Sequence, residues 1–450
     1  MSELLSRARC EEIFGLVRQA ARSEGVQDVE AMLSAGVNAL TRFANNTIHQ
    51  NVAERGEHVS VRALIDGRTA RANTNRFDAD SIRRVTREAI AITRLQQPDP
   101  DLLPLPEPGP VMPVERYFDA TAEATPMDRA LAVKDAIEAV ESQSLTAAGI
   151  YSTGQSALAL LNSRGLFDYH LETMAQFSIT ALGGDSSGWA KATACNAAAL
   201  DPRGLAARAA RKAVASAEPR ELAPGRYTVI LEPAAVLDLV GQLFGDFGVT
   251  AVHDGRSFLT GREHEKLFGG NITVFDDVRH PAQAGAPFDG EGVARQRLTL
   301  VDRGAIRQIP CSRQAARKAG VEPTGHGFPL PNELGEAPMN IVIAGGETPV
   351  GQMIASTARG LLVTRLWYIR EVDPYQKIMT GMTRDGTFLV EDGKIVRGVR
   401  NFRFNQSVIE LLSNVEALSP ASRAAGEEAS DMVVPAMKAH DFHFNEVTRF

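Results

Sequence analysis

The sequence has few of the residues that bind metals or cross-link a chain. Its 450 residues include 3 cysteines and 9 histidines. Cys10, Cys195 and Cys311 are odd in number and far apart, which indicates reduced thiols and not a disulfide framework or a CxxC metal site. No apolar run reaches the roughly 18 residues that a membrane-spanning helix needs. We therefore expect a cytoplasmic protein.

The chain also lacks an excess of positive charge. It has 48 Lys and Arg against 55 Asp and Glu, which gives a formal net charge of -7. Basic surface supplies most of the non-specific affinity of a nucleic-acid groove, so this composition argues against such a groove. Glu11 and Glu12 interrupt the apolar residues near the N-terminus, so a secretory leader is not expected there.

The residues that are present are typical of a globular protein, with 44% hydrophobic and 23% charged residues. Helical and hairpin patterns occupy separate stretches. This favours a multi-domain α+β fold with mostly antiparallel sheets and flanking helices. Seven of the 23 prolines lie in residues 96–114, which predicts an extended connector. We expect an N-terminal α+β domain (1–97), a Pro-rich linker (98–114), a central α+β domain (115–222) and a C-terminal β-rich domain (223–450).

Local patterns predict particular elements on both sides of the linker. Short strands are expected at 40–43 and 48–52, followed by a hairpin that turns at the Asp-Gly pair 66–67, where positive φ is tolerated. Asp80 is expected to cap the next helix. Beyond the linker, Asp201 followed by proline predicts the start of another helix.

Residues 226–247 have the pattern of a strand followed by a helix. Alternation over Tyr227–Leu231 predicts the strand, and Pro233 is typical of a first helical turn. Apolar residues then recur at helical spacing and predict an amphipathic helix: Val236, Leu237, Val240, Leu243 and Phe244.

This strand and helix resemble the metal-binding frame of the TldD/PmbA family. Further segments similar to the family follow one another in its order: 40–50, 183–190, 288–292, 360–365 and 387–395. In TldD-type members the helix carries His-Glu-x-x-x-His, which binds a metal and supplies a general base. The resemblance places that motif on Leu237, Asp238 and Gln242, which are therefore degenerate metal-site positions. Leucine cannot bind zinc, and a glutamine amide is a poor substitute for imidazole.

The resemblance implies a PmbA/TldE-like subunit without its own metal. TldD-type members also use a cysteine near the C-terminus, whereas the last cysteine here is Cys311. The implied function is that of a subunit in a TldD/TldE-type peptidase of small or unfolded peptides. The zinc and the general base would come from a TldD-like partner in a heterodimer. The alternative is a homodimeric peptide-binding or maturation protein without protease activity.

Two other motifs offer different chemistry. The segment 184–188 matches G-x-S-x-G, so a serine hydrolase using Ser186 is a third hypothesis, although a Gly/Ser turn explains the spacing as well. His264 and Glu265 begin a zincin-like sequence that lacks the second histidine. A metal site assembled from distant histidines, His253, His264 and His280, remains an alternative.

A peptide groove is suggested by two segments of the C-terminal region. Gly345 and Gly346 lie between a predicted strand and helix, where free backbone N–H groups can hold an anion or a carboxylate. Arg365 and Tyr368 belong to a dense aromatic and charged segment, in which Arg370 is a further cation. A tight turn and ordinary packing are the alternative interpretations of these two segments.

Overall fold

The first half of the chain forms one long antiparallel sheet in the computed structural model, which describes residues 4–448. Its strand order is β3-β2-β1-β4-β5-β6. The bounds are β1 (Asp28–Ala44), β2 (Thr47–Ile65), β3 (Arg68–Thr74), β4 (Thr146–Asn162), β5 (Phe167–Leu182) and β6 (Ser187–Ala194). The predicted N-terminal and central regions thus share a sheet, in which β1 pairs with β4 from Glu30 to Phe43. Their division into separate domains stays a prediction.

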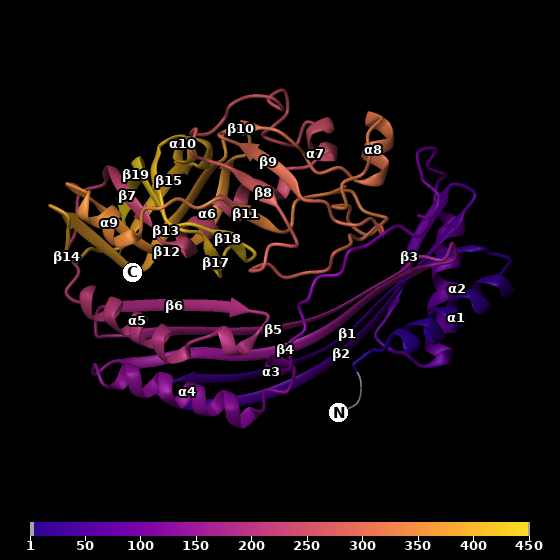
Figure 1. The fold of residues 1–450 in the computed structure, drawn as a ribbon, viewed down its shortest axis with the longest axis horizontal. Helices are drawn as coiled ribbons and strands as arrows, with labels where there is room; N and C mark the ends of the chain where they lie inside the picture. The colour runs from indigo at the N-terminus through magenta and orange to yellow at the C-terminus, as the bar shows by residue number, and fades with distance from the viewer. Residues whose placement is uncertain (1–3, 449–450) are drawn as a thin grey trace.

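Helices cover one face of this sheet and the C-terminal unit faces the other (Figure 1). The helices are α1 (Arg7–Ser23), α2 (Ala79–Leu95), α3 (Asp119–Ala122), α4 (Pro126–Glu141), the 3₁₀ helix η1 (Ala197–Ala199) and α5 (Pro202–Ala215). Because strand side chains alternate between faces, Leu33 and Ala35 pack toward α1 and α2, while Lys191 and Thr193 reach the C-terminal unit. No helix within residues 4–448 is long and apolar enough to cross a membrane.

The helix caps agree with the sequence in one case and differ in another. Asp201 caps α5 by accepting a hydrogen bond from the backbone N–H of Gly204, 2.8 Å away, so this prediction is confirmed. The cap of α2 is Asp78, which accepts from the N–H of Ser81 at 2.9 Å, and not Asp80. The prediction of Asp80 was wrong because the helix begins two residues earlier, which leaves Asp80 inside the first turn.

The first two strands are much longer than the short segments expected at 40–43 and 48–52. β1 has 17 residues and β2 has 19. Most of the first half of β2 is exposed, so its sequence does not alternate between apolar and polar residues. Backbone pairing with β1 nevertheless extends the strand through this half. The hairpin between β2 and β3 turns at Asp66 and Gly67, with φ of 48° and 73°, as the Asp-Gly pair predicted.

The C-terminal unit contains two further sheets. One has the order β10-β9-β8-β11-β18-β17, and the other has the order β12-β7-β19-β15-β13-β14, with β16 pairing β19. The strands of the first are β8 (Val274–Asp276), β9 (Leu298–Asp302), β10 (Ala305–Ile306), β11 (Ile341–Ile343), β17 (Ser422–Ala424) and β18 (Met432–Val434). Those of the second are β7 (Gly225–Leu231), β12 (Arg359–Asp373), β13 (Ile378–Glu391), β14 (Lys394–Gly398), β15 (Phe402–Ser407), β16 (Val415–Leu418) and β19 (Met437–Val447).

Short helices complete this unit. They are α6 (Pro233–Val240), the 3₁₀ helix η2 (Gly241–Asp246), α7 (Val249–His253), α8 (Arg313–Ala319), α9 (Val350–Ala355) and α10 (Val408–Ser413). Among the named strands only the pairs β7–β12 and β11–β18 are parallel. The predicted α+β class with mostly antiparallel sheets is therefore confirmed.

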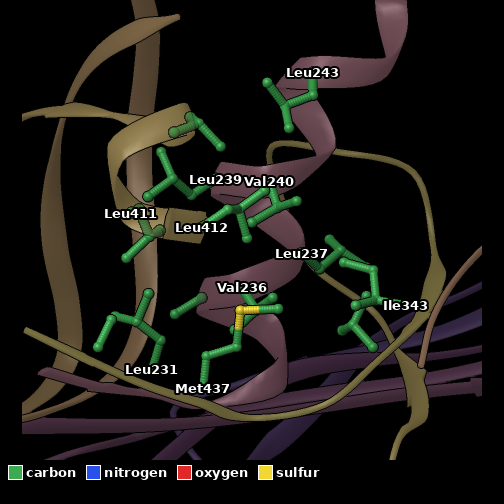
Figure 2. Packing of buried hydrophobic residues seen from close by; sticks show 14 of the residues in the cluster. Leu231, Val236, Leu237, Leu239, Val240, Leu243, Ile343, Leu411, Leu412 and Met437 are labelled. Atoms are coloured by element: carbon green, nitrogen blue, oxygen red, sulfur yellow. The ribbon is translucent and has the colours of Figure 1, made fainter. Parts of the chain in front are cut away.

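Helix α6 lies in the hydrophobic core of the C-terminal unit. Figure 2 shows its side chains among residues from β7, β11, α10 and β19, including Leu231, Ile343, Leu411 and Met437. Every residue from Ala235 to Val240 is buried. The expectation of an amphipathic helix was therefore wrong, because sheets and loops cover this helix on all sides. The α-helix also ends at Val240, and η2 continues the chain as a 3₁₀ helix.

Candidate functional site

Helix α6 binds the loop after β17 through the carboxylate of Asp238. This side chain is fully buried, and its Oδ1 accepts hydrogen bonds from the backbone N–H groups of Glu427 and Glu428, each at 2.9 Å. A Cβ atom at Gly426 would lie 2.1 Å from the same oxygen. Only glycine allows the loop to approach the helix so closely. Asp238 therefore fixes the position of this loop.

Leu237 and Gln242 take part in the same contact. Leu237 is fully buried, and its Cδ2 would lie 2.4 Å from a Cβ at Gly426. The Gln242 side-chain amide donates to the backbone carbonyls of Asp238 and Glu428, both at 3.1 Å. The structure therefore brings all three predicted positions together, where they pack the core or hold the loop.

Glu428 connects this loop to β12. Its carboxylate accepts hydrogen bonds from the backbone N–H groups of Tyr368, at 2.7 Å, and Ile369, at 3.3 Å. The Arg370 guanidinium lies 3.6 Å from the same carboxylate and 4.4 Å from the ring centroid of Tyr368. Sequence reasoning missed Glu428, because its partners lie about sixty residues away in the chain and its only local signal is a glycine followed by two glutamates.

The environment of Asp238 disfavours its charged form. Burial raises the pKa of this carboxyl group to about 6, although the two backbone N–H groups and the charge of Arg365 act in the opposite direction. Oδ2 has no hydrogen-bond partner among the described residues. Burying a carboxylate with one unsatisfied oxygen costs free energy, so the charged form of Asp238 destabilises the fold at neutral pH.

The three histidines proposed as a scattered metal site are not gathered. Among residues 4–448 there is no group of three or more His, Cys, Asp or Glu side chains that could hold a metal ion. His253 is 82% exposed and lies beside Asp254, and His264 is also exposed. The hypothesis that His253, His264 and His280 converge was therefore wrong for this conformation, because they lie on separate surface segments.

Arg365 forms a buried ion pair that joins the C-terminal unit to the long sheet. Its Nε lies 2.7 Å from Oδ2 of Asp385, and its guanidinium stands over the rings of Trp189 and Trp367, 4.9 and 5.2 Å from their centroids. Oδ1 of Asp385 accepts a hydrogen bond from the Ser187 hydroxyl at 2.7 Å. Trp189 and Ser187 belong to β6, so this cluster attaches β6 to β12 and β13.

Breaking the ion pair should destabilise this junction. We expect Arg365→Met to lower the free energy of unfolding by about 3 kcal/mol, since Asp385 remains buried with only the Ser187 hydroxyl and the more distant Arg384 near it. Chemical denaturation measures the change. The double variant Arg365→Met with Asp385→Asn should recover part of it, because no buried charge remains. A double variant as unstable as the sum of the two single variants would contradict this explanation.

Gly345 and Gly346 lie away from this cluster, against the segment 418–421. The N–H of Gly346 donates to the carbonyl of Ser419 at 2.9 Å. A Cβ at Gly345 would approach the backbone nitrogen of Ala421 to 2.4 Å. These glycines allow two chain segments to pack closely, and the N–H of Gly346 is occupied within the protein.

Ser186 lies in the turn between two strands. β5 ends at Leu182 and β6 begins at Ser187, so the strand-turn-helix geometry of a nucleophile elbow is not formed. The turn lines a cavity of about 610 Å³ between the central region and the C-terminal unit, together with Asp385 and Arg400. Within the described part of the chain, the lining of this cavity includes no histidine.

A smaller cavity of about 370 Å³ lies beside the end of α6. Its lining includes Gln242 and Glu428 and several apolar side chains, Phe244, Phe328, Leu334, Met339 and Met432. Leu334 and Met339 are 60% and 49% exposed, so the apolar wall continues to the surface. Apolar walls with a few polar groups are typical of sites that take a side chain or a small molecule.

The acidic segment 288–292 organises a second buried region, where the C-terminal unit meets the long sheet. Oδ1 of Asp289 accepts from the N–H groups of Glu291 and Val293, both at 2.9 Å, and Oδ2 accepts from that of Gly327 at 2.7 Å. Burial, and then the charge of Asp289, raise the pKa of Glu291 to about 7 and that of Asp168 on β5 to about 6. The segment thus brings three carboxyl groups together at the junction of the two units.

These raised pKa values predict that stability depends on pH. Both groups bind protons more tightly in the folded than in the unfolded chain, so their favourable contribution is complete at low pH and is lost as pH rises through about 6 to 7. The free energy of unfolding should fall between about pH 4 and pH 7. Asp168→Asn should raise it at the higher pH by about 1 kcal/mol and flatten the dependence, measured by denaturation across pH. An unchanged slope would contradict this assignment.

Comparisons with known proteins identify the family of the chain. Three family models match in order: PmbA/TldA metallopeptidase domain 1 at residues 29–93, the central domain at 117–217 and the C-terminal domain at 224–446. The fold and the strand-helix frame are thus those of a metallopeptidase family. The chain belongs to the PmbA/TldA metallopeptidase family.

Individual relatives are distant. Metalloprotease PmbA of Escherichia coli O157:H7 is 22% identical over 441 residues, which cover 93% of each chain. A metalloprotease of Methanothermobacter thermautotrophicus is 24% identical over 286 residues, which cover 60% of this chain and 61% of that relative. The solved structure of TldE from Thermococcus kodakarensis superimposes with a TM-score of 0.86 at 22% identity, over 96% of this chain and 99% of that one. This last likeness confirms the fold.

Proposed function

We propose that the chain is a PmbA/TldE-like subunit of a TldD/TldE-type peptidase that degrades or processes small or unfolded peptides. A TldD-like partner would supply the zinc and the general base. The chain itself would complete the enclosure around the peptide. Family membership and the likeness to TldE support the assignment to this group.

One observation carries the proposal. At the helix positions where the resemblance places a metal motif, the Asp238 carboxylate is committed to the backbone N–H groups of Glu427 and Glu428. Leu237 is buried beside it and offers no ligand atom. The contact closes the space between the helix and the loop, so this region serves to hold structure. If a second subunit binds the metal, this subunit can keep the strand and helix of the family without the metal ligands.

The cavity beside α6 gives this subunit a surface for peptides. Gln242 and Glu428 supply polar groups next to an apolar wall, at the place where Tyr368 and Arg370 reach the surface. An extended peptide is bound largely through its main chain, and an apolar recess accepts side chains of many shapes. Enclosure by two subunits would exclude water from the reacting bond.

The test is to produce the chain alone and together with a TldD-like subunit from the same genome. We expect co-purification, zinc in the partner only, and cleavage of an unstructured peptide by the complex but not by this chain. A complex whose partner carries alanine in place of both motif histidines is the matched control and should be inactive. Stoichiometric zinc and chelator-sensitive cleavage by the isolated chain would refute the proposal. A stable homodimer without a partner would favour the peptide-binding alternative.

A further inference from the structure

A third cavity, of about 630 Å³, lies between the Pro-rich linker and the C-terminal unit. The linker provides Pro106 and Pro110, and the opposite wall comes from the segment 292–297 and the start of α8. Its volume is that of a site for a small molecule. Gly292 has φ of 76°, and a Cβ there would lie 2.5 Å from the Leu166 side chain, so the wall beneath the linker is closely packed.

Arginine dominates the lining. Four arginines, Arg279, Arg295, Arg297 and Arg313, face two glutamates, Glu107 and Glu322. Glu107 already lies 3.3 Å from the guanidinium of Arg164, which stands outside the lining. The cavity therefore has more positive than negative charge, in a chain whose net charge is -7.

Three of these guanidinium groups, those of Arg279, Arg295 and Arg313, form no ion pair among the described residues, whereas Arg297 pairs with Asp277. Arg279 is exposed at the cavity mouth, and no ion pair or side-chain hydrogen bond involves its guanidinium. Nη2 of Arg313 donates to the backbone carbonyl of Pro104 at 3.0 Å, while the carboxylates of Glu291, Asp289 and Glu30 act on its charge without forming an ion pair with it. Arginine binds carboxylate and phosphate groups through paired N–H donors, which are available here.

Arg297 is held by two contacts, and Arg295 is partly buried. Arg297 stacks 3.9 Å from the ring centroid of Phe275, and its Nε lies 3.3 Å from Asp277. Nη1 of Arg295 is buried without a hydrogen-bond partner in the described chain. A cation held by stacking loses little conformational entropy when it binds an anion, so this wall is preorganised.

We propose that this cavity binds an anion with at least two neighbouring carboxylate or phosphate groups. The free donors of Arg279 at the mouth and of Arg313 under the linker would contact the anion from two sides. Glu322 at the edge would disfavour ligands that place negative charge there. The proposal is independent of the peptidase assignment, since none of these residues lies at α6 or in its loop.

Calorimetric titration of the full-length chain with citrate and with pyrophosphate tests this, with sodium chloride at matched ionic strength as the reference. We expect at least one of them to bind with a submillimolar Kd. Arg279→Gln and Arg313→Gln should each weaken that binding about tenfold, which is the loss of one charged hydrogen bond. The control Arg303→Gln removes a cation that is 78% exposed outside the cavity and should leave the Kd unchanged.

Binding of citrate alone would identify carboxylates as the ligand groups, and binding of pyrophosphate alone would identify phosphates. Binding of both would support a cavity that recognises the negative charge of the ligand without distinguishing carboxylate from phosphate. No binding of either at about 10 mM, or equal weakening by Arg303→Gln and Arg279→Gln, would overturn the proposal. If Arg313→Gln fails to fold because its bond to Pro104 is lost, Arg279→Gln decides the question, since the Arg279 guanidinium makes no ion pair or hydrogen bond among the described residues.

Discussion

Replacing Gly188 with alanine is expected to lower the free energy of unfolding by about 4 kcal/mol. Helix α5 packs directly onto β6 at this glycine, and an added Cβ would lie 2.0 Å from the carbonyl oxygen of Ala209 and 2.5 Å from the backbone nitrogen of Ala213. Both obstacles are backbone atoms, so the whole helix has to move away from the sheet. Overpacking of this kind costs about 1–3 kcal/mol even where side chains can adjust, and more where the backbone must shift.

Gly184 provides the matched control, because it belongs to the same G-x-S-x-G motif. No atom lies within 4 Å of a Cβ built there, so Gly184→Ala should change the free energy of unfolding by less than about 0.5 kcal/mol. Thermal and urea denaturation of the two variants give the comparison. Equal stability of both would show that α5 does not rest on β6 at Gly188. If only Gly188→Ala is destabilising, the second glycine of G-x-S-x-G is needed for packing of β6 against α5.

Asp238→Ala is expected to cost about 3 kcal/mol and to release the loop 426–428 from α6. The change removes the acceptor for two backbone N–H groups and leaves them without a partner inside the protein. Each unsatisfied buried donor costs about 1–3 kcal/mol. Hydrogen exchange at the amides of Glu427 and Glu428, together with urea denaturation, measures both effects. Faster exchange at these two amides should accompany the loss of stability.

Asp238→Asn separates the hydrogen bonds from the charge. The asparagine side-chain oxygen can still accept both bonds, and the buried charge is gone, so stability should remain near that of the unmodified chain and exceed it at pH above about 6. Protection of both loop amides should also be retained. If the asparagine variant were as unstable as the alanine variant, the carboxylate charge itself would be the stabilising element.

The sequence predicted the elements whose signals are local. The Asp-Gly turn at 66–67 and the cap at Asp201 need only neighbouring residues, and the structure contains both. The strand and helix at 225–240 were also recognised, since proline and the alternating pattern mark them. The cap of α2 was misplaced by two residues because Asp78 and Asp80 are both good caps, and only the path of the chain selects one of them.

The environment of the candidate site could not be predicted in the same way. The buried state of α6 depends on β11, α10 and β19, which lie far along the chain and surround the helix on every side. The partners of Asp238 are main-chain groups of Glu427 and Glu428, which any residue type could have supplied. A spacing rule identifies side-chain ligands, but it contains no information about backbone donors that arrive from a distant loop.

The pairing of β1 with β4 imposes an order on folding. Residue 30 lies opposite residue 162, and the Pro-rich linker (98–114) lies between the two strands in the chain. While the chain is being made, the hairpin of β1 and β2 is complete at residue 65, and residues 66–145 must follow before β4 begins to cover its inner edge. An open strand edge invites pairing with another nascent chain. The Pro-rich linker is poorly suited to add a strand to that edge, because each proline lacks the backbone donor that a strand ladder needs.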